Sequence, residues 1–474
     1  MAEKTDSKAA PTPASIPQQT GPLAGTFLSY FRQHPTGFWF IFWGELAERC
    51  SYYGMRAILT LYLLESSLHF STGQTNRTSH GFIAACYLLP LLGGYLADNF
   101  LGKYWTLVSF CIPYIAGHFI LGIEAIPALF IALAFLAMGT GATKPNIPTL
   151  MGMTYDQKRA GQDKLRSDAF AMFYFAINIG AFLSSLFMPE IRNHWGYRIA
   201  FLFPAGLMVI AFPIFAAGKP HYAVETIRRV KKTPEQRRQQ WIVVGRLAGL
   251  FLVVAFFWGV YDQSSTTWIE FAQEHIDLNI FGWTVRADQF QWINPLLILI
   301  LLPLITLLWK YLDARGWVLR STDKMLVGFV LTTATMGVMA LAGYLVLQHS
   351  GQKLSPLWIV VAYIIVTSAE VCISVVGLEL AFTAAPKALK SFVAALWLMT
   401  VAGGNLGDMV ITPWYENVFN PAEYFGVLTA MMLAITVIFF FVAQRFNQSA
   451  AQWQTEDPEA HLGDSLAVKA VSDY

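Results

Sequence analysis

Apolar segments long enough to cross a lipid bilayer recur about twelve times along the chain. A helix needs roughly 20 predominantly apolar residues to span the hydrocarbon core, where the backbone must satisfy its own hydrogen bonds. The composition agrees, because 55% of the residues are hydrophobic, 13% are charged and the mean hydropathy is +0.47. The sequence therefore predicts an all-α polytopic membrane protein with about 12 transmembrane helices. The expected segments are 37–65, 80–99, 104–124, 126–152, 167–188, 199–217, 241–263, 292–312, 324–348, 356–384, 390–414 and 424–445.

Lysine and arginine residues concentrate in alternate loops. The loops that join even-numbered to odd-numbered segments carry eighteen of them, whereas the opposite loops carry five. Because cytoplasmic loops are enriched in these residues, both termini are expected in the cytoplasm. The longest basic loop, 219–240, divides the segments into six and six. The expected parts are a tail 1–36, a six-helix bundle 37–217, a basic linker 218–240, a second six-helix bundle 241–445 and a tail 446–474, with both tails disordered.

The six-plus-six arrangement predicts a major facilitator fold, in which two bundles enclose a central cavity and rock about a midplane site. The loop from Gly93 to Lys103 supports this prediction, because it resembles the cytoplasmic loop motif of that superfamily. It combines small residues, which allow close helix approach, with the acid Asp98 and the base Lys103. A simple tight turn is the alternative interpretation, since Gly and Asp are common in turns.

The first apolar segment carries a stripe of charged and phenolic side chains. Their spacing of i, i+3, i+4, i+7, i+8 and i+11 places them on one face of a helix. Ionised groups in hydrocarbon are costly and usually functional. We therefore expect this face to line a polar pathway inside the bundle. The stripe consists of Glu45, Glu48, Arg49, Tyr52, Tyr53 and Arg56.

Further polar residues lie inside apolar segments of both halves of the chain. A single one would be explained by helix packing or by a side chain that reaches the membrane surface. A shared water-filled cavity explains the whole set better than several unpaired charges in a dry core. The Gly and Pro residues around one of them, Lys144, also predict an irregular or kinked backbone there. The set consists of Lys144, Asn178, Asp262, Asn294 and Glu370.

Three motifs resemble the signatures of the proton-dependent oligopeptide transporter family. They are Glu45-x-x-Glu48-Arg49-x-x-Tyr52-Tyr53-Gly54, the loop from Gly93 to Gly102, and Phe173-Tyr174-x-x-Ile177-Asn178-x-Gly180. Similar family positions are Lys144-Pro145-Asn146, Asn294-Pro295, Glu370 with Gly377-Leu378, and Trp397. The resemblance implies a symporter that takes up di- and tripeptides by alternating access. It would use the proton gradient as its energy source and no cofactor.

The resemblance also implies roles for individual residues. Glu370 would bind the peptide ammonium group, and Arg56 and Lys144 would bind the carboxylate from the other half. Asn178 and Asn294 would hydrogen-bond the peptide ends or backbone. Opposed, partly desolvated charges suit a zwitterionic ligand. The expected aromatic walls are Tyr52, Tyr53, Tyr87, Trp258 and Trp397.

Proton coupling is expected where two carboxylates of the stripe lie one turn apart. Their mutual repulsion favours a bound proton, whereas nearby cations favour the ionised form. Protonation would release a cation and shift the conformational equilibrium. The residues expected to act in this way are Glu45, Glu48, Arg49 and Lys144. By resemblance, Arg56 and Asp262 would form a gate near the external end, with a static salt bridge as the alternative.

Other functions are left open by the sequence. A transporter of the same fold for nitrate or another small organic anion is the closest alternative, and a non-transporting peptide receptor is more distant. The chain has no HExxH, GxSxG or P-loop motif, which argues against an enzyme or an ATP-driven pump. Four scattered cysteines favour neither a disulfide framework nor a zinc site.

The expected location is the cell inner membrane, as a multi-pass protein. We expect the lipid bilayer, protons and di- and tripeptides as partners, and neither nucleic acid nor an obligate protein partner. His118 is expected to be a hydrogen-bonded packing residue, and Glu124 has no assigned role.

Overall fold

Long helices make up nearly all of the protein. The computed structural model describes residues 32–225, 233–280, 282–349, 352–377, 380, 390–415 and 417–456. The first half contains α2 (Thr36–Glu65), α3 (Thr72–Leu96), α4 (Lys103–Leu121), α5 (Ile126–Lys158) and α6 (Asp163–Ala217). The second half contains α7 (Pro234–Asp262), α8 (Thr267–His275), α9 (Ile293–Ala314), α10 (Ser321–Gln348), α11 (Leu357–Glu370), α13 (Lys390–Ile411) and α14 (Pro421–Glu456).

Short elements connect the long helices. They are the helices η1 (Ala97–Leu101), η2 (Lys219–His221), η3 (Gln263–Ser265), η4 (Ala287–Trp292), η5 (Val371–Val375) and η7 (Thr412–Trp414), and the antiparallel strands β1 (Asn279–Ile280) and β2 (Trp283–Thr284). At the predicted superfamily loop, η1 ends at Gly102, whose φ of 81° suits a residue without a Cβ. Asp98 and Lys103 form an ion pair across this turn.

Helix α6 corresponds to two of the predicted segments. Gly196, with φ 76° and ψ 169°, interrupts it, because only glycine adopts this backbone conformation readily. With α6 counted as two parts and α8 left out as short, the described residues form twelve long helices, which confirms the prediction. With α6 counted as one, nine of the helices in this part of the chain are apolar enough, by length and composition, to cross a membrane. α2 is not among them, since its charged stripe interrupts the apolar run.

Of the two backbone features predicted around Lys144, a break in the helix is not observed, and a kink stays a prediction. α5 is helical from Ile126 to Lys158 and contains Pro145 and Pro148. The glycines of this stretch serve close packing instead, because a Cβ on Gly141 would lie 2.5 Å from Leu89 Cβ on α3. Irregular backbone occurs at η1 and η5, two π-helical turns that the sequence did not indicate.

Helices extend into the predicted C-terminal tail and into the predicted linker. α14 continues to Glu456, past the start of the predicted tail 446–474, and α7 begins at Pro234, inside the predicted linker 218–240. Polar residues that favour helix continue both helices beyond their apolar parts. Helix limits predicted from hydropathy alone therefore miss these polar ends. The remainder of these regions, and residues 1–31, lie outside the described residues.

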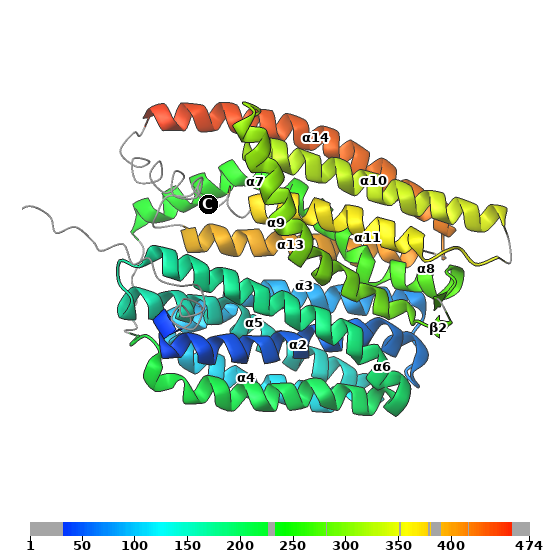
Figure 1. Cartoon of the computed structure of the whole chain (residues 1–474), viewed down its shortest axis with the longest axis horizontal. Coiled ribbons are helices and arrows are strands. Elements are labelled where there is room, and N and C mark those ends of the chain that lie inside the picture. The colour runs from blue at the N-terminus through cyan, green and yellow to red at the C-terminus, as the bar shows by residue number, and fades with distance from the viewer. Residues whose placement is uncertain are drawn as a thin grey trace, which may run out of the picture.

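Each half has its own hydrophobic core. One core is built from residues between Phe38 and Tyr222, and the other almost entirely from residues between Leu247 and Phe446. Figure 1 shows the helices of the two halves side by side, with α3 and α13 at the boundary between them. These two helices pack against each other, as do α6 and α9.

The two ends of the molecule differ. We call the end that carries α8 and the β1–β2 strands the hairpin end, and the end where α2 begins and α14 ends the tail end. Figure 1 shows the hairpin end at the right and the tail end at the left. Most of the predicted site residues lie between these ends, on α2, α5, α7, α9 and α11.

Candidate functional site

Two carboxylates and one guanidinium group form a compact cluster on α2, which we call the α2 cluster. Arg49 Nε lies 3.2 Å from Glu45 Oε1 and also donates to Glu48 Oε2. The Tyr114 hydroxyl on α4 donates to the other Glu48 oxygen over 3.0 Å. The three charged side chains are buried. The i, i+3 and i+4 spacing has therefore brought together the acids and the arginine that were expected to couple protons.

Lys144, on α5, forms no salt bridge with these carboxylates in the described part of the chain. Its Nζ is 3.2 Å from the centre of the Tyr87 ring on α3, which is a cation–π contact. Lys144 is half-buried and, among the described residues, has no carboxylate within 4.0 Å. Its ammonium group is thus stabilised by an aromatic face and has no anionic partner in the described part of the chain.

Two tyrosines continue the α2 stripe toward the hairpin end. The Tyr52 and Tyr53 rings contact each other edge to face, with centroids 5.2 Å apart. The Arg49 guanidinium group lies 5.5 Å from the Tyr52 ring centre. Tyr52 is buried and Tyr53 is half-buried, so the two rings link the α2 cluster to the more accessible part of the stripe.

Glu370 provides a carboxylate on the second half. It is the last residue of α11 and directly precedes the π-helical η5, a type of irregular turn that is frequent at functional sites. Asn294 on α9 donates to Glu370 over 2.8 Å and to Thr367 Oγ1 over 3.1 Å. Glu370 is half-buried. No cation among the described residues lies within 4.0 Å of it. Leu378, from the same predicted motif, lies outside the described residues.

The predicted gate residues form an ion pair between the halves. Arg56 on α2 donates to Asp262 Oδ1 at the end of α7 over 2.6 Å and to Ser265 Oγ over 3.2 Å. One turn further along α2, Thr60 donates to the Ser265 carbonyl over 2.9 Å. These contacts join the two halves toward the hairpin end.

Sequence reasoning missed a second buried polar network beside this ion pair. His80 on α3 lies 2.9 Å from Asn405 Oδ1 and 3.5 Å from Asp408 Oδ2, both on α13. Asn405 in turn donates to Asp262 Oδ2 over 2.6 Å, and Gln263 donates to Asp408 Oδ1 over 3.1 Å. All five side chains are buried. Asp408 had a recognisable signal, because an acid within an apolar segment indicates a specific environment.

More cross-half contacts surround the hairpin end. Arg192 on α6 forms a buried ion pair with Asp288 on η4. Glu65, at the end of α2, lies 3.5 Å from Arg286 and accepts a hydrogen bond from Gln273 over 3.0 Å. The hairpin end is therefore closed by polar contacts between the halves.

Three predicted binding residues are engaged in packing. Asn178 donates to the Tyr174 carbonyl of its own helix over 2.9 Å. Trp258 contacts Tyr261 with ring centroids 5.4 Å apart. Trp397 lies edge to face with Phe251, 5.8 Å between centroids, and covers Gly377. Trp258 and Trp397 belong to the core of the second half.

His118 and Glu124 have structural contacts. His118 is buried, stacks on Tyr114 with centroids 5.3 Å apart and hydrogen-bonds Ser51 over 2.9 Å, which confirms the packing prediction. Glu124 accepts a hydrogen bond from the Ser67 hydroxyl over 2.6 Å.

Comparisons with known proteins identify the family. A sequence model described as "POT family" matches residues 104–244 and 224–428. Mouse solute carrier family 15 member 2 is 29% identical over 384 residues, which cover 70% of this chain and 51% of that protein. Human solute carrier family 15 member 1 is 30% identical over 374 residues, covering 66% of this chain and 52% of that protein. The chain therefore spans about half the length of these relatives.

A solved structure agrees with the sequence comparisons. A point mutant of a peptide transporter POT, in complex with alafosfalin, superposes with a TM-score of 0.79 at 26% identity and covers 88% of this chain and 96% of its own. The agreement confirms both the predicted major facilitator fold and the predicted family. The chain belongs to the POT family of the major facilitator superfamily.

Proposed function

We propose that the protein is a proton-coupled symporter that takes up di- and tripeptides by alternating access. One observation carries the proposal: the two halves present opposite, half-buried charges without ionic partners among the described residues. Glu370 is the acid and Lys144 is the base. A zwitterionic peptide neutralises both, with its ammonium group at Glu370 and its carboxylate at Lys144, because opposite charges attract strongly where water is partly excluded.

The surrounding side chains suit a ligand of this kind. Asn294 holds the Glu370 carboxylate and can also donate to the peptide backbone. Tyr53 and Tyr87, both half-buried, supply aromatic surface for varied side chains. Three further residues contact other protein residues, so we place them behind the side chains that would touch the peptide. They are Asn178, Trp258 and Trp397. The similarity to a solved peptide transporter supports the peptide as substrate.

Proton coupling is assigned to the α2 cluster. Glu45, Glu48 and Arg49 carry two acids and one base in a buried position. Binding of one proton makes this group electrically neutral and weakens the electrostatic attraction between the two acids and Arg49. The freed guanidinium group then changes its interactions with Tyr52 and with the substrate region, which biases the two conformations of the transporter.

Alternating access requires that the hairpin end opens. We place this end outside the cell and the basic tail end in the cytoplasm, with both termini there, according to the lysine and arginine distribution. The bundles 37–217 and 241–445 rock about the site, and the Arg56–Asp262 ion pair must break when the outside opens. We also place the protein in the cell inner membrane, on the basis of its compact loops and its family resemblance.

Transport into proteoliposomes tests the function. Addition of Ala-Ala to the outside should acidify the lumen, and an inward proton gradient should accumulate labelled Ala-Ala. Unlabelled tripeptides should compete for uptake, whereas nitrate should not. Competition by nitrate alone would replace the peptide with a small anion as substrate. Binding of Ala-Ala without any flux would identify a receptor and contradict transport.

A further inference from the structure

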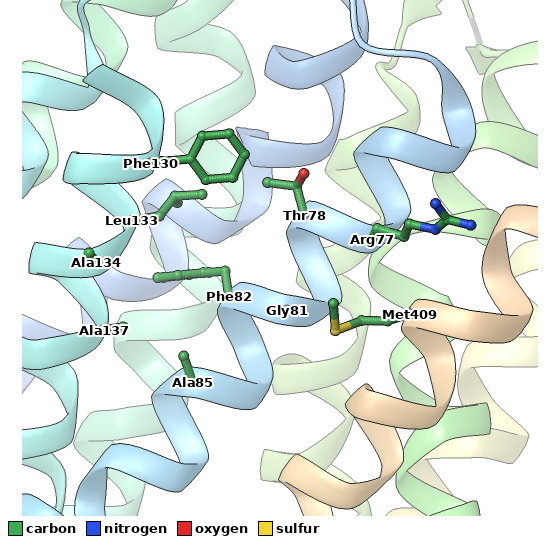
Figure 2. Close-up of a pocket in the computed structure, with 10 residues that line it drawn as sticks. All are labelled: Arg77, Thr78, Gly81, Phe82, Ala85, Phe130, Leu133, Ala134, Ala137 and Met409. Atoms are coloured by element: carbon green, nitrogen blue, oxygen red, sulfur yellow. The ribbon is translucent and has the colours of Figure 1, made fainter. Parts of the chain in front are cut away.

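A groove of about 410 Å³ lies where α3, α5 and α13 meet near the hairpin end. Figure 2 shows α3 between the two other helices, with Phe130 and Leu133 of α5 on one side and Met409 of α13 on the other. Arg77 and Thr78 are the polar residues of its lining. The groove is thus an apolar channel with one charged side chain, formed by both halves of the protein.

The surroundings of the groove face the lipid. Phe130 on α5 is 52% exposed, and Leu406 and Val410 on α13 are 48% and 60% exposed. Apolar side chains with this exposure on membrane-spanning helices contact lipid chains. The groove therefore opens into the bilayer, and none of the residues that line it is a proposed peptide-binding residue.

Arg77 is the unusual member of this surface. It is exposed and forms neither a hydrogen bond nor an ion pair with any residue that the structure describes. It follows Thr72, the first residue of α3, by five positions, or about 7.5 Å along the helix axis. A long cationic side chain at this depth reaches the headgroup region, where anions are available.

The dimensions of the groove match half of a bilayer. Ala85, at the other end of its lining on α3, lies about 12 Å deeper than Arg77 by helix rise. One leaflet of the hydrocarbon core is about 15 Å thick. When the headgroup of a lipid contacts Arg77, the part of its acyl chain nearest the headgroup therefore lies alongside α3 over the whole length of the groove.

We propose that this groove binds an anionic phospholipid of the leaflet at the hairpin end, with the phosphate at Arg77 and an acyl chain against Gly81 and Phe82. The planar guanidinium group binds phosphate through two hydrogen bonds, which a neutral apolar ligand cannot provide. Because Met409 belongs to the second half, the lipid contacts both halves at their boundary. The proposal does not depend on the identity of the transported substrate.

Native mass spectrometry of the purified, delipidated protein tests the site. Phosphatidylglycerol and phosphatidylcholine with identical chains are titrated separately. We expect one preferred phosphatidylglycerol per chain, and about fivefold weaker binding of that lipid to Arg77→Gln, with phosphatidylcholine binding unchanged. Arg198→Gln is the matched control, since Arg198 is also exposed near the hairpin end but does not line the groove.

A second variant tests the acyl-chain part of the site. Ala134→Leu adds volume to the groove lining at an exposed position, so folding is not at risk. It should weaken the binding of both lipids and leave the preference for phosphatidylglycerol intact. Equal binding of the two lipids to the unmodified protein, or unchanged phosphatidylglycerol binding by Arg77→Gln, would overturn the proposal. So would a dimer formed across this face that excludes lipid.

Discussion

The α2 cluster and Glu370 are both carboxylate sites within the membrane, but they are neutralised differently. In the α2 cluster, Arg49 contacts Glu45 and Glu48 within one helix, and all three side chains are buried. Glu370 is half-buried and held by the Asn294 amide, with no cation among the described residues nearby. With every group ionised, each site carries one excess negative charge.

This difference supports the cation that we propose for each site. In the α2 cluster, Tyr114 and Arg49 contact the carboxylates directly and all three charged side chains are buried, so the proposed occupant is a proton. Glu370 has polar neighbours but no counter-charge among the described residues, and its accessible side suits a larger cation such as a peptide ammonium group. Variants of individual acids test this division, beginning with the largest expected effect.

Removal of one charge from the α2 cluster should abolish proton coupling but leave peptide exchange across the membrane intact. Glu48→Gln keeps the shape and the acceptor for Tyr114 but leaves Arg49 with one acid. Uptake driven by a proton gradient should fall to the equilibrium level, while exchange of labelled for unlabelled peptide persists, because no proton needs to be carried in exchange. Both assays are made in proteoliposomes.

Glu124→Gln serves as the control for this experiment. Glu124 is an exposed acid bound to Ser67, outside the α2 cluster, and its neutralisation should change neither assay. Uphill uptake retained by Glu48→Gln would show that the cluster is only structural.

Neutralisation of Glu370 should weaken substrate binding and leave coupling intact. Hydrogen bonds to charged groups contribute about 1.5–3 kcal/mol, so Glu370→Gln should raise the Kd of Ala-Ala on the order of 10- to 100-fold. N-acetylated Ala-Ala lacks the ammonium group and should bind the variant and the unmodified protein equally. An equal loss of affinity for both peptides would place the ammonium group elsewhere. Equilibrium binding to purified protein provides the measurement.

The Arg56–Asp262 pair should have a smaller effect, since Arg56 also donates to Ser265 and its side chain is partly exposed. Asp262→Asn should reduce uptake about fivefold by weakening the closed hairpin end. The doubly exchanged variant, Arg56→Asp with Asp262→Arg, should regain the ion pair but not transport if Arg56 also binds the peptide carboxylate. Restored uptake would limit Arg56 to a gate.

The sequence predicted those parts of the site that lie along one helix. The i, i+3, i+4 pattern is sufficient to bring Glu45, Glu48 and Arg49 together, because helix geometry alone fixes their neighbours. Hydropathy likewise predicted the helices, including the two that Gly196 separates within α6. The irregular backbone expected around Lys144 is not observed, since α5 stays helical from Ile126 to Lys158 with two prolines inside it.

Contacts between the halves were harder to predict. The meeting of His80 on α3 with Asp408 on α13 depends on the relative depth and rotation of two helices more than 300 residues apart in the chain. No local pattern encodes that register. The Arg56–Asp262 pair was predicted only through a family resemblance, and this network had no such guide.

The smallest expected effect comes from the buried network around His80 and Asp408. Asp408→Asn keeps the volume and an acceptor for Gln263 but removes the charge next to His80. Loss of one such contact costs about 0.5–1.5 kcal/mol, so hydrogen exchange of the α8 amides at the hairpin end should become about threefold faster or more. Asp156→Asn, at the tail end, should leave this exchange unchanged. If Asp408→Asn left α8 exchange unchanged as well, the closed hairpin end would depend on Arg56 and Asp262 without help from α13. Faster exchange would instead identify Asp408 as a third kind of carboxylate site. Its partner, His80, lies on the opposite half of the protein, unlike the partners of the α2 cluster and of Glu370.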